Sequence, residues 1–174
     1  CTLPASRAIY GKIGGTDFTG SLLVGHSTTG TLDAAVQNTG VGFTALDAIT
    51  SGDYNTVVGS SAGTAITSGI SNSFVGAFSG QSGTDLSQNT GVGVSSLEKS
   101  TGNSNTGIGY YAGNKNATGT YNTSIGTEAL KGVLGNNHSY NTALGAKSNE
   151  AITTGGYNVT AGYQSGENLT TGSG

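Results

Sequence analysis

The sequence has few charged residues, and this scarcity excludes several kinds of protein. Lysine and arginine together number 6, aspartate and glutamate 9, and the formal net charge is −3. Without a cluster of basic residues the chain lacks the electrostatic footprint of a protein that binds nucleic acid or an anionic membrane, so we expect neither partner. The sequence also lacks any apolar run of about 18 residues, so it predicts no membrane span.

Cysteine and methionine are scarcer still. The single cysteine, Cys1, cannot form an internal disulfide. It could be a lipid-modified first residue, an intermolecular link, or the residue at which a fragment begins. Because methionine is absent altogether, we favour a processed or partial chain over lipidation, and no segment that resembles a signal peptide decides the matter.

What the sequence has instead is glycine, 32 of 174 residues, and one phrase that recurs along most of the chain. Asn55-Thr56-Val57-Val58-Gly59 is a clear copy, and successive copies begin 17, 17, 17, 16, 17, 19 and 17 residues apart. A ninth, degenerate copy begins at Ser21. Such short-period self-similarity is typical of a solenoid. The asparagines that begin the copies are Asn38, Asn55, Asn72, Asn89, Asn105, Asn122, Asn141 and Asn158.

We number positions within each repeat from this asparagine, which is position 0. Position 1 is usually threonine, position 3 is always aliphatic, position 4 is always glycine and position 7 is always small. Side chains alternate along a strand, so positions 1 and 3 share one face, and threonine and valine both favour strands. Glycine at position 4 permits a turn. We therefore predict that positions 1 and 3 point inward, with these core residues at position 3: Val41, Val58, Val75, Val92, Ile108, Ile125 and Leu144.

These patterns predict an all-β protein, because the apolar period is 2 rather than 3.6. We expect a parallel β-helix or β-roll of about nine 17-residue coils over residues 21–174, with a second, weaker strand through position 11 of each repeat. The coils would stack about 4.8 Å apart, and the asparagines at position 0 would form a ladder of side-chain amides. The extra residues before Asn141 should lie in a polar loop near residues 135–138.

Residues 1–20 lack the repeat and read as a cap or attachment segment, because solenoids need atypical ends to cover an open core. Four apolar side chains in or near this stretch could supply the cover: Ile9, Tyr10, Ile13 and Phe18.

The phrase Asn-Thr-x-Val-Gly-x-x-Ala resembles the repeats of viral tail-fibre and tail-spike proteins and of large bacterial surface proteins. Its Val-Gly-x-x-Ala part is similar to the head repeats of trimeric autotransporter adhesins of the YadA type. The resemblance covers residues 21–174. It implies a left-handed parallel β-roll, three identical chains packed side by side, and a role in attachment.

Several patterns that often mark catalytic or cofactor sites also occur, but the repeat itself accounts for them. Residues 40–45 and 107–112 match a dinucleotide-binding fingerprint without the helix that must follow it. Ser61 lies in a nucleophile-elbow pattern, yet we expect His26 and His138 to lie coils away. The carboxylate pairs that could cleave glycans occupy unrelated repeat positions: Asp47 with Asp53, Asp85 with Glu98, and Glu128 with Glu150. We expect no catalytic residue, no cofactor and no metal site.

The tyrosines follow the repeat more closely. Four directly precede a repeat asparagine, and two more lie at position 5. They could form an aromatic stack along one edge of the rod, or a stripe that recognises a sugar or a receptor, since tyrosine offers an apolar face and a hydroxyl group. These candidate recognition residues are Tyr54, Tyr121, Tyr140, Tyr157, Tyr110 and Tyr163.

The sequence thus predicts a non-enzymatic structural and adhesive fibre segment, extracellular, at a cell surface or on a virion. We expect a homotrimer that attaches to a surface glycan or host receptor, with outward residues at position 2, such as Val57, Phe74 and Ala143, in contact with identical chains. One alternative is a subunit of an end-to-end filament. Another is a solenoid that binds ice or another crystal surface through its threonines. The inward orientation that we expect for position 1 would favour the fibre over the crystal binder.

Overall fold

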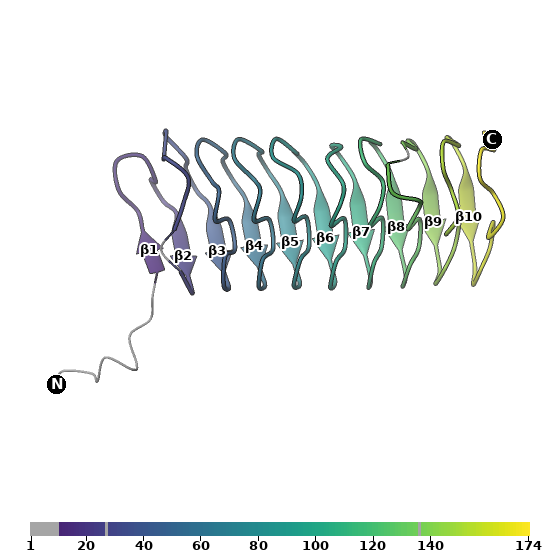
Figure 1. Cartoon of the computed structure of the whole chain (residues 1–174), viewed down its shortest axis with the longest axis horizontal. Coiled ribbons are helices and arrows are strands. Elements are labelled where there is room, and N and C mark those ends of the chain that lie inside the picture. Colours follow the sequence, from purple (N-terminus) through teal and green to yellow (C-terminus); the bar gives the residue numbers. More distant parts are fainter. Residues whose placement is uncertain (1–10, 27, 136) are drawn as a thin grey trace.

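The computed structural model describes residues 11–26, 28–135 and 137–174, which form a β-solenoid (Figure 1). A single ten-stranded sheet runs along it in chain order, and the described residues form no helix. The predicted all-β solenoid is therefore confirmed. Its strands are β1 (Gly11–Ile13), β2 (Leu22–Val24), β3 (Thr39–Val41), β4 (Thr56–Val58), β5 (Ser73–Val75), β6 (Thr90–Val92), β7 (Thr106–Ile108), β8 (Thr123–Ile125), β9 (Thr142–Leu144) and β10 (Val159–Ala161).

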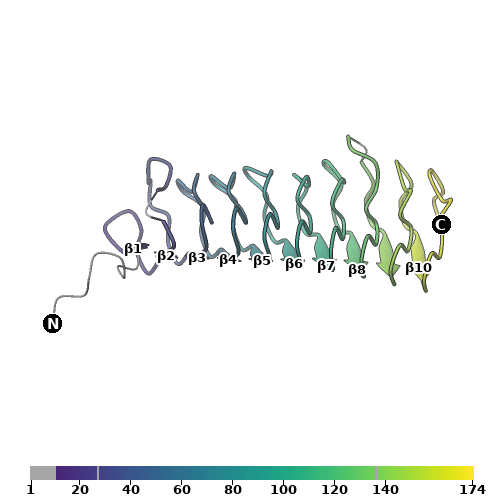
Figure 2. The ribbon, with the colours of Figure 1, turned by 60° about the horizontal axis from the view of Figure 1, so that its bottom comes forward.

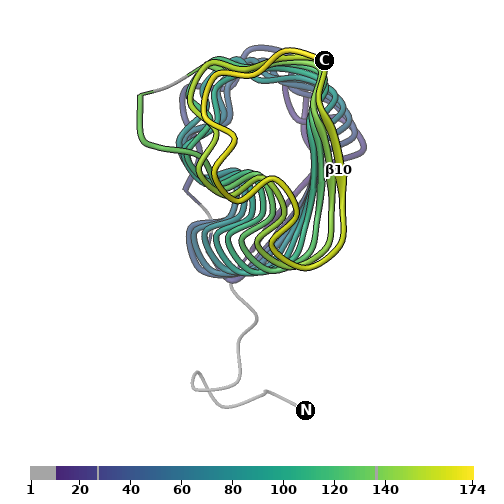
Figure 3. The ribbon, with the colours of Figure 1, turned by 90° about the vertical axis from the view of Figure 1, so that its right-hand side faces the viewer.

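Each strand from β3 onward pairs in parallel with the strand of the preceding coil, without a shift in register. Val58 of β4, for example, pairs with Val41 of β3 and with Val75 of β5. The longer spacing before Asn141 leaves the register intact, because Thr123 still pairs with Thr142. Viewed along the axis, the coils lie over one another, and the extra residues leave the common outline as a projecting loop between β8 and β9 (Figure 3).

The asparagines at position 0 form the predicted ladder inside the rod. The Asn72 side-chain amide donates to Oδ1 of Asn55 (2.9 Å) and to the carbonyl oxygen of Leu86 in its own coil (2.7 Å). Asn72 Oδ1 in turn accepts the backbone N–H of Asn89 (3.0 Å). All eight asparagines are at most 8% exposed. The ladder also crosses the 16-residue step, where the backbone N–H of Asn105 donates to Asn89 Oδ1 (2.9 Å).

The strands face the opposite way from the prediction. Side chains at position 2 lie inside, and Val57, Phe74 and Ala143 are each 0% exposed, so our assignment of these residues to chain–chain contacts was wrong. The position 3 core was wrong as well, because its side chains point outward. Of the predicted core residues, Val41, Val58, Val75, Val92, Ile108 and Leu144 are 36–53% exposed, and Ile125 is half-buried.

The asparagine ladder explains this orientation. An amide ladder is strong only where water does not compete for its hydrogen bonds, so position 0 must face the interior. Because side chains alternate along a strand, position 2 then also faces inward, and positions 1 and 3 face outward.

Positions 2 and 8 of a coil contact each other in the interior. A Cβ added at Gly63 would lie 3.3 Å from Cγ2 of Val57, and one added at Gly80 would lie 2.4 Å from the Phe74 ring. In four successive coils a bulky residue at one of these positions faces glycine at the other. The clearest pairs are Gly40 with Leu46, Val57 with Gly63, Phe74 with Gly80, and Gly91 with Leu97.

Position 11 contributes buried side chains but no strand. Ile49, Ile66 and Ile152 are each 0% exposed, yet none lies in a strand, so the predicted second strand was wrong. The reason is a turn that begins at position 8: the N–H of Ile49 donates back to the carbonyl oxygen of Leu46 (3.2 Å).

At the N-terminal end, β1 pairs antiparallel with β2, and Phe18 is buried against the first coils as part of the main core cluster. Ile13 is 81% exposed, so it does not supply the expected cover. Ile9 and Tyr10 lie outside the described residues.

The pairing of positions 2 and 8 predicts that the two can be exchanged. Val57→Gly should lower the free energy of unfolding by about 2–4 kcal/mol through a cavity and a flexible strand residue. Gly63→Leu should lower it by about 1–3 kcal/mol through overpacking. The double variant reproduces the Gly40 and Leu46 pair of the preceding coil, where Leu46 already adopts a φ of 57° against 53° at Gly63. We expect it to unfold within about 1 kcal/mol of the parent in urea titrations. Additive losses would contradict the pairing.

Candidate binding face

The outward side chains of the strands form two straight columns along one side of the rod, the side on which Figure 2 shows the strands. One column is the position 1 threonines and the other is the position 3 aliphatic residues, in register from coil to coil. Each strand ends at the glycine of position 4, where a side chain has no room: a Cβ added at Gly59 would lie 2.5 Å from the carbonyl carbon of Gly76 in the next coil. The chain therefore turns away from the sheet at the same place in every coil.

Two further columns border the strands, one at position −1 and the other at position 5. Position −1 has a positive φ in every coil from Gln37 to Tyr157, although none of these residues is glycine. That backbone conformation turns the chain into the strand and leaves the side chain outside. We call the outward residues at positions −1, 1, 3 and 5 of the repeats the uncharged face, because none of them is lysine, arginine, aspartate or glutamate.

Three of the predicted tyrosines stack along the position −1 border. The ring centroids of Tyr121 and Tyr140 are 5.2 Å apart, those of Tyr140 and Tyr157 are 4.9 Å apart, and the rings are within 9° and 2° of parallel. The predicted aromatic stack is therefore confirmed for these three residues. Because each inner ring face is covered by a neighbour, the stack offers solvent mainly ring edges and hydroxyl groups.

The other three tyrosines lie outside this stack. Tyr54 is exposed at the same border several coils away. Tyr163 and Tyr110 are exposed on the position 5 border, and the Tyr110 ring meets Tyr111 edge to face at 4.3 Å. They leave aromatic faces open to a partner.

Charged side chains collect elsewhere, on the turns that follow position 5. Lys131 contacts Glu128 (2.6 Å) and Glu150 (3.6 Å), and Lys147 contacts the same two carboxylates at 3.4 and 3.7 Å. The hydrogen bond from Lys131 lowers the pKa of Glu128 below its usual value. The structure thus brings Glu128 and Glu150 together, but with Glu128 ionised rather than protonated, which is the wrong state for a glycosidase acid.

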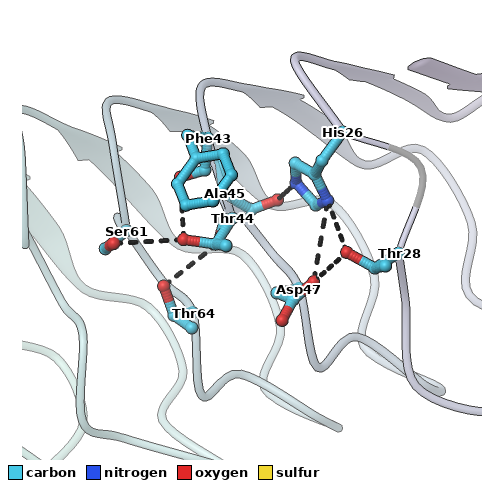
Figure 4. Close-up of polar contacts among 8 residues, drawn as sticks. All are labelled: His26, Thr28, Phe43, Thr44, Ala45, Asp47, Ser61 and Thr64. Atoms are coloured by element: carbon cyan, nitrogen blue, oxygen red, sulfur yellow. Dashed lines mark hydrogen bonds and ion pairs between the residues drawn. The ribbon is translucent and has the colours of Figure 1, made fainter. Parts of the chain in front are cut away.

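The elbow serine has no histidine beside it. Ser61 Oγ bonds Oγ1 of Thr44 (3.0 Å). Nε2 of His26 contacts the carbonyl oxygen of Ala45 at 2.6 Å and, because a carbonyl can only accept, carries a proton there (Figure 4). The His26 ring is therefore engaged away from Ser61.

The sequence reasoning missed a small polar cluster around His26. Nδ1 of this ring lies 3.0 Å from Thr28 Oγ1 and 3.7 Å from Asp47 Oδ1, and the Thr28 hydroxyl donates to Asp47 (Figure 4). The available signal was that Asp47 follows Thr28 by 19 residues, close to one repeat. The Thr28 hydroxyl gives its proton to Asp47 rather than to the ring, and the cluster joins the first two coils.

His138 is not in a polar loop as expected, but inside the rod at 1% exposure. Among the described residues neither ring nitrogen has a hydrogen-bond partner, and the same holds for the buried side-chain amide of Asn149. Burial lowers the pKa of His138 from its usual 6.5 to about 4. The ring therefore stays neutral at physiological pH.

Comparison of the chain with models of protein families, with curated proteins and with solved structures gave no match. The resemblance to fibre and adhesin repeats therefore stays a prediction. Over the described part of the chain there is no helix long and apolar enough to cross a membrane. The same residues contain no group of three or more histidine, cysteine, aspartate or glutamate side chains that could hold a metal ion.

Because His138 is buried and neutral, we expect the fold to lose stability as the pH falls below 6.5, before most carboxylates are protonated. Below pH 6.5 the unfolded chain binds a proton that the folded chain refuses until about pH 4, so stability falls as pH decreases through this window. Between pH 7 and pH 5 the loss should be about 2 kcal/mol. His138→Leu should remove that loss, since Leu86 occupies the equivalent position three residues before an asparagine of the ladder. Urea unfolding midpoints at pH 7 and pH 5 measure this loss of stability. An equal loss in the His138→Leu variant would show that His138 is not its cause.

Proposed function

We propose that the chain is a non-enzymatic structural and adhesive fibre segment, extracellular, at a cell surface or on a virion. The observation that carries the proposal is the uncharged face itself. Its aliphatic column at position 3 and its exposed border aromatics run along the rod, and exposed apolar side chains gathered in this way usually mark a contact with another molecule. The in-register ladder beneath it keeps the columns of that surface aligned from coil to coil.

The composition of the face supports identical chains as partners. It is depleted of charge and contains exposed aromatic residues such as Phe43, Tyr110 and Tyr163, the pattern found at the centre of protein interfaces. Nine stacked strands are about 40 Å long, and positions −1 to 5 span at most about 20 Å. The face is thus at most about 800 Å², which is no more than the area that each partner buries in a standard stable interface.

A homotrimer, with three uncharged faces directed toward a common axis, fits these features and the sequence resemblance. In this trimer the position 3 side chains contact the neighbouring chains, in place of the position 2 side chains that we expected to do so. The ion pairs around Lys131 and Lys147 would then lie on the outside, where charge keeps a fibre soluble. Surface glycans or a host receptor would contact this outer surface or an end of the rod.

The proposal predicts rods without catalytic turnover. Electron microscopy of the purified chain should show particles with a long axis of roughly 40 Å, and ester and glycoside probe substrates should remain uncleaved. Ser61→Ala, His138→Ala and Glu128→Gln should behave as the parent does in these assays, with circular dichroism as the check on folding. Turnover that disappears in any of these folded variants would overturn the proposal. Retention of the fluorescent chain on a printed glycan array would support adhesion to sugars.

A second candidate function is binding to ice or another crystal surface, and one observation favours it. Position 1 points outward, contrary to expectation, and its threonines present hydroxyl and methyl groups in register from coil to coil, interrupted in the middle by Ser73. Aromatic side chains along both borders suit this function less well, because they rise above the plane that a crystal would have to meet.

This candidate has its own measurement. If the face binds ice, the chain should slow the recrystallisation of ice in a sucrose solution, and Thr90→Tyr in the middle of the array should abolish the effect. Thr118→Tyr, at an exposed position outside the uncharged face, serves as the control and should keep it. Crystals that grow as fast as in buffer would eliminate the candidate.

A further inference from the structure

A shallow polar pocket of about 350 Å³ lies among the ion-paired side chains, outside the uncharged face. Its floor is Gly132 and Ala151, which occupy position 10 of two successive coils, and the coils on either side have the longer Lys115 and Asn168 at that position. No side chain can easily fill the floor at residue 132, because φ is 69° there and an added Cβ would lie 3.0 Å from Nε2 of His138. The volume is within the range of sites that hold small molecules.

One wall of the pocket is apolar. Val133, which is 49% exposed, begins the longer connection between β8 and β9 that projects from the common outline in Figure 3. Leu134 follows it and is 66% exposed. Insertions into solenoid repeats are often found on the face that binds a ligand, and an exposed aliphatic wall can contact a methyl group.

The charges around the pocket cancel. Along the rod the order is Lys115, Lys131, Glu150 and Glu167, one in each of four successive coils. Two ammonium groups and two carboxylates give no net field that would favour an anion or a cation. The pocket therefore suits a neutral ligand that has both hydrogen-bond donors and acceptors.

The two central charges have hydrogen-bonding capacity to spare. The Glu150 carboxylate lies 3.6 Å from Lys131 and 3.7 Å from Lys147, which is beyond hydrogen-bond length. The two ammonium groups thus hold this carboxylate in place and leave its lone pairs open. Lys131 donates one hydrogen bond, to Glu128 (2.6 Å), although an ammonium group has three N–H donors.

We infer that this pocket binds an acetamido sugar, a hexose unit that carries an N-acetyl group. An acetamido group combines an N–H that donates, a carbonyl oxygen that accepts and a methyl group. The N–H would reach Glu150, the carbonyl oxygen would reach Lys131, and the methyl group would contact Val133. This inference rests on the proposed adhesive function and names the kind of surface glycan that is held.

The ends of the pocket suit the rest of the sugar. Within the described residues Lys115 and Glu167 have no ion pair, and three coil steps separate them, about 14 Å. Hydroxyl groups both donate and accept, so those of a disaccharide can bond an ammonium group at one end and a carboxylate at the other. A blocked peptide has the same amide but no hydroxyl groups beside it, so both ends would stay unpaired.

Titration of the purified chain with two disaccharides, followed by backbone amide NMR shifts, tests the inference. N,N′-diacetylchitobiose should bind with a dissociation constant of about 1 mM and should shift the amides of residues 131–133 and 150–151 most. Cellobiose, which has hydroxyl groups in place of the acetamido groups, should bind at least about tenfold more weakly. Equal affinities for the two sugars, or a blocked alanine tripeptide that binds as tightly as diacetylchitobiose, would overturn the assignment.

Two substitutions with matched controls locate the site. Ala151→Leu fills the floor and should weaken the binding of diacetylchitobiose at least about tenfold, whereas Ala48→Leu, the same change at position 10 of a distant coil, should leave it unchanged. Lys115→Met removes an ammonium group and should weaken binding about threefold to tenfold, whereas Lys99→Met, also at position 10, should not. Circular dichroism checks folding, and Lys115→Met keeps the test decisive if Ala151→Leu does not fold.

This site and the proposed function fail separately. Binding that is unchanged in folded Ala151→Leu or in Lys115→Met would show that the sugar lies elsewhere, and a parent chain that does not bind diacetylchitobiose would eliminate the site. Either result leaves the fibre function standing. Catalytic turnover of the probe substrates would instead remove that function and leave the sugar site intact.

Discussion

The structure depends on the buried amide ladder at position 0. An unpaired amide in the interior would cost more than its hydrogen bonds return, so every asparagine must meet the one before it. Asn72 does so through Asn55, and Asn89 through Asn72. This single requirement fixes the register of the coils, the side of the sheet that faces the core, and the places where extra residues are allowed.

Much of the fold could be predicted from the sequence because register and period are properties of identical residues at identical spacing. The asparagine ladder and the parallel stacking of Val58 on Val41 and Val75 followed from this alone. The orientation of the strand could not be predicted by the same means. Threonine and valine at positions 1 and 3 are the better strand formers, whereas position 2 is occupied by residues as different as Gly40 and Phe74, and its compensation by position 8 becomes visible only once the two are known to touch.

The candidate face was hidden from the sequence for the same reason. Its aliphatic column was assigned to the core, where charge is not expected. The absence of charge along the four columns therefore did not indicate a binding surface. The tyrosine stack, by contrast, was predictable, because Tyr121, Tyr140 and Tyr157 share one repeat position. His138 was assigned to a polar loop because its neighbours are polar, although its ring fills a space left by glycine in several other coils.

Inside the rod, several coils exchange a bulky residue and a glycine between positions 2 and 8, and this allows Phe74 and Gly91 to occupy equivalent positions in successive coils. A search for identical residues therefore finds the ladder and overlooks the packing.

The stacking direction also determines how the rod responds to force. The hydrogen bonds between coils run along the axis, so a pull on the two ends loads every coil in series rather than shearing many bonds at once. The weakest coil opens first and releases 17 residues, an extension of about 55 Å for a coil that contributed about 5 Å of length. A tether made of such units lengthens in discrete steps and absorbs work at each one, while the remaining coils keep their shape.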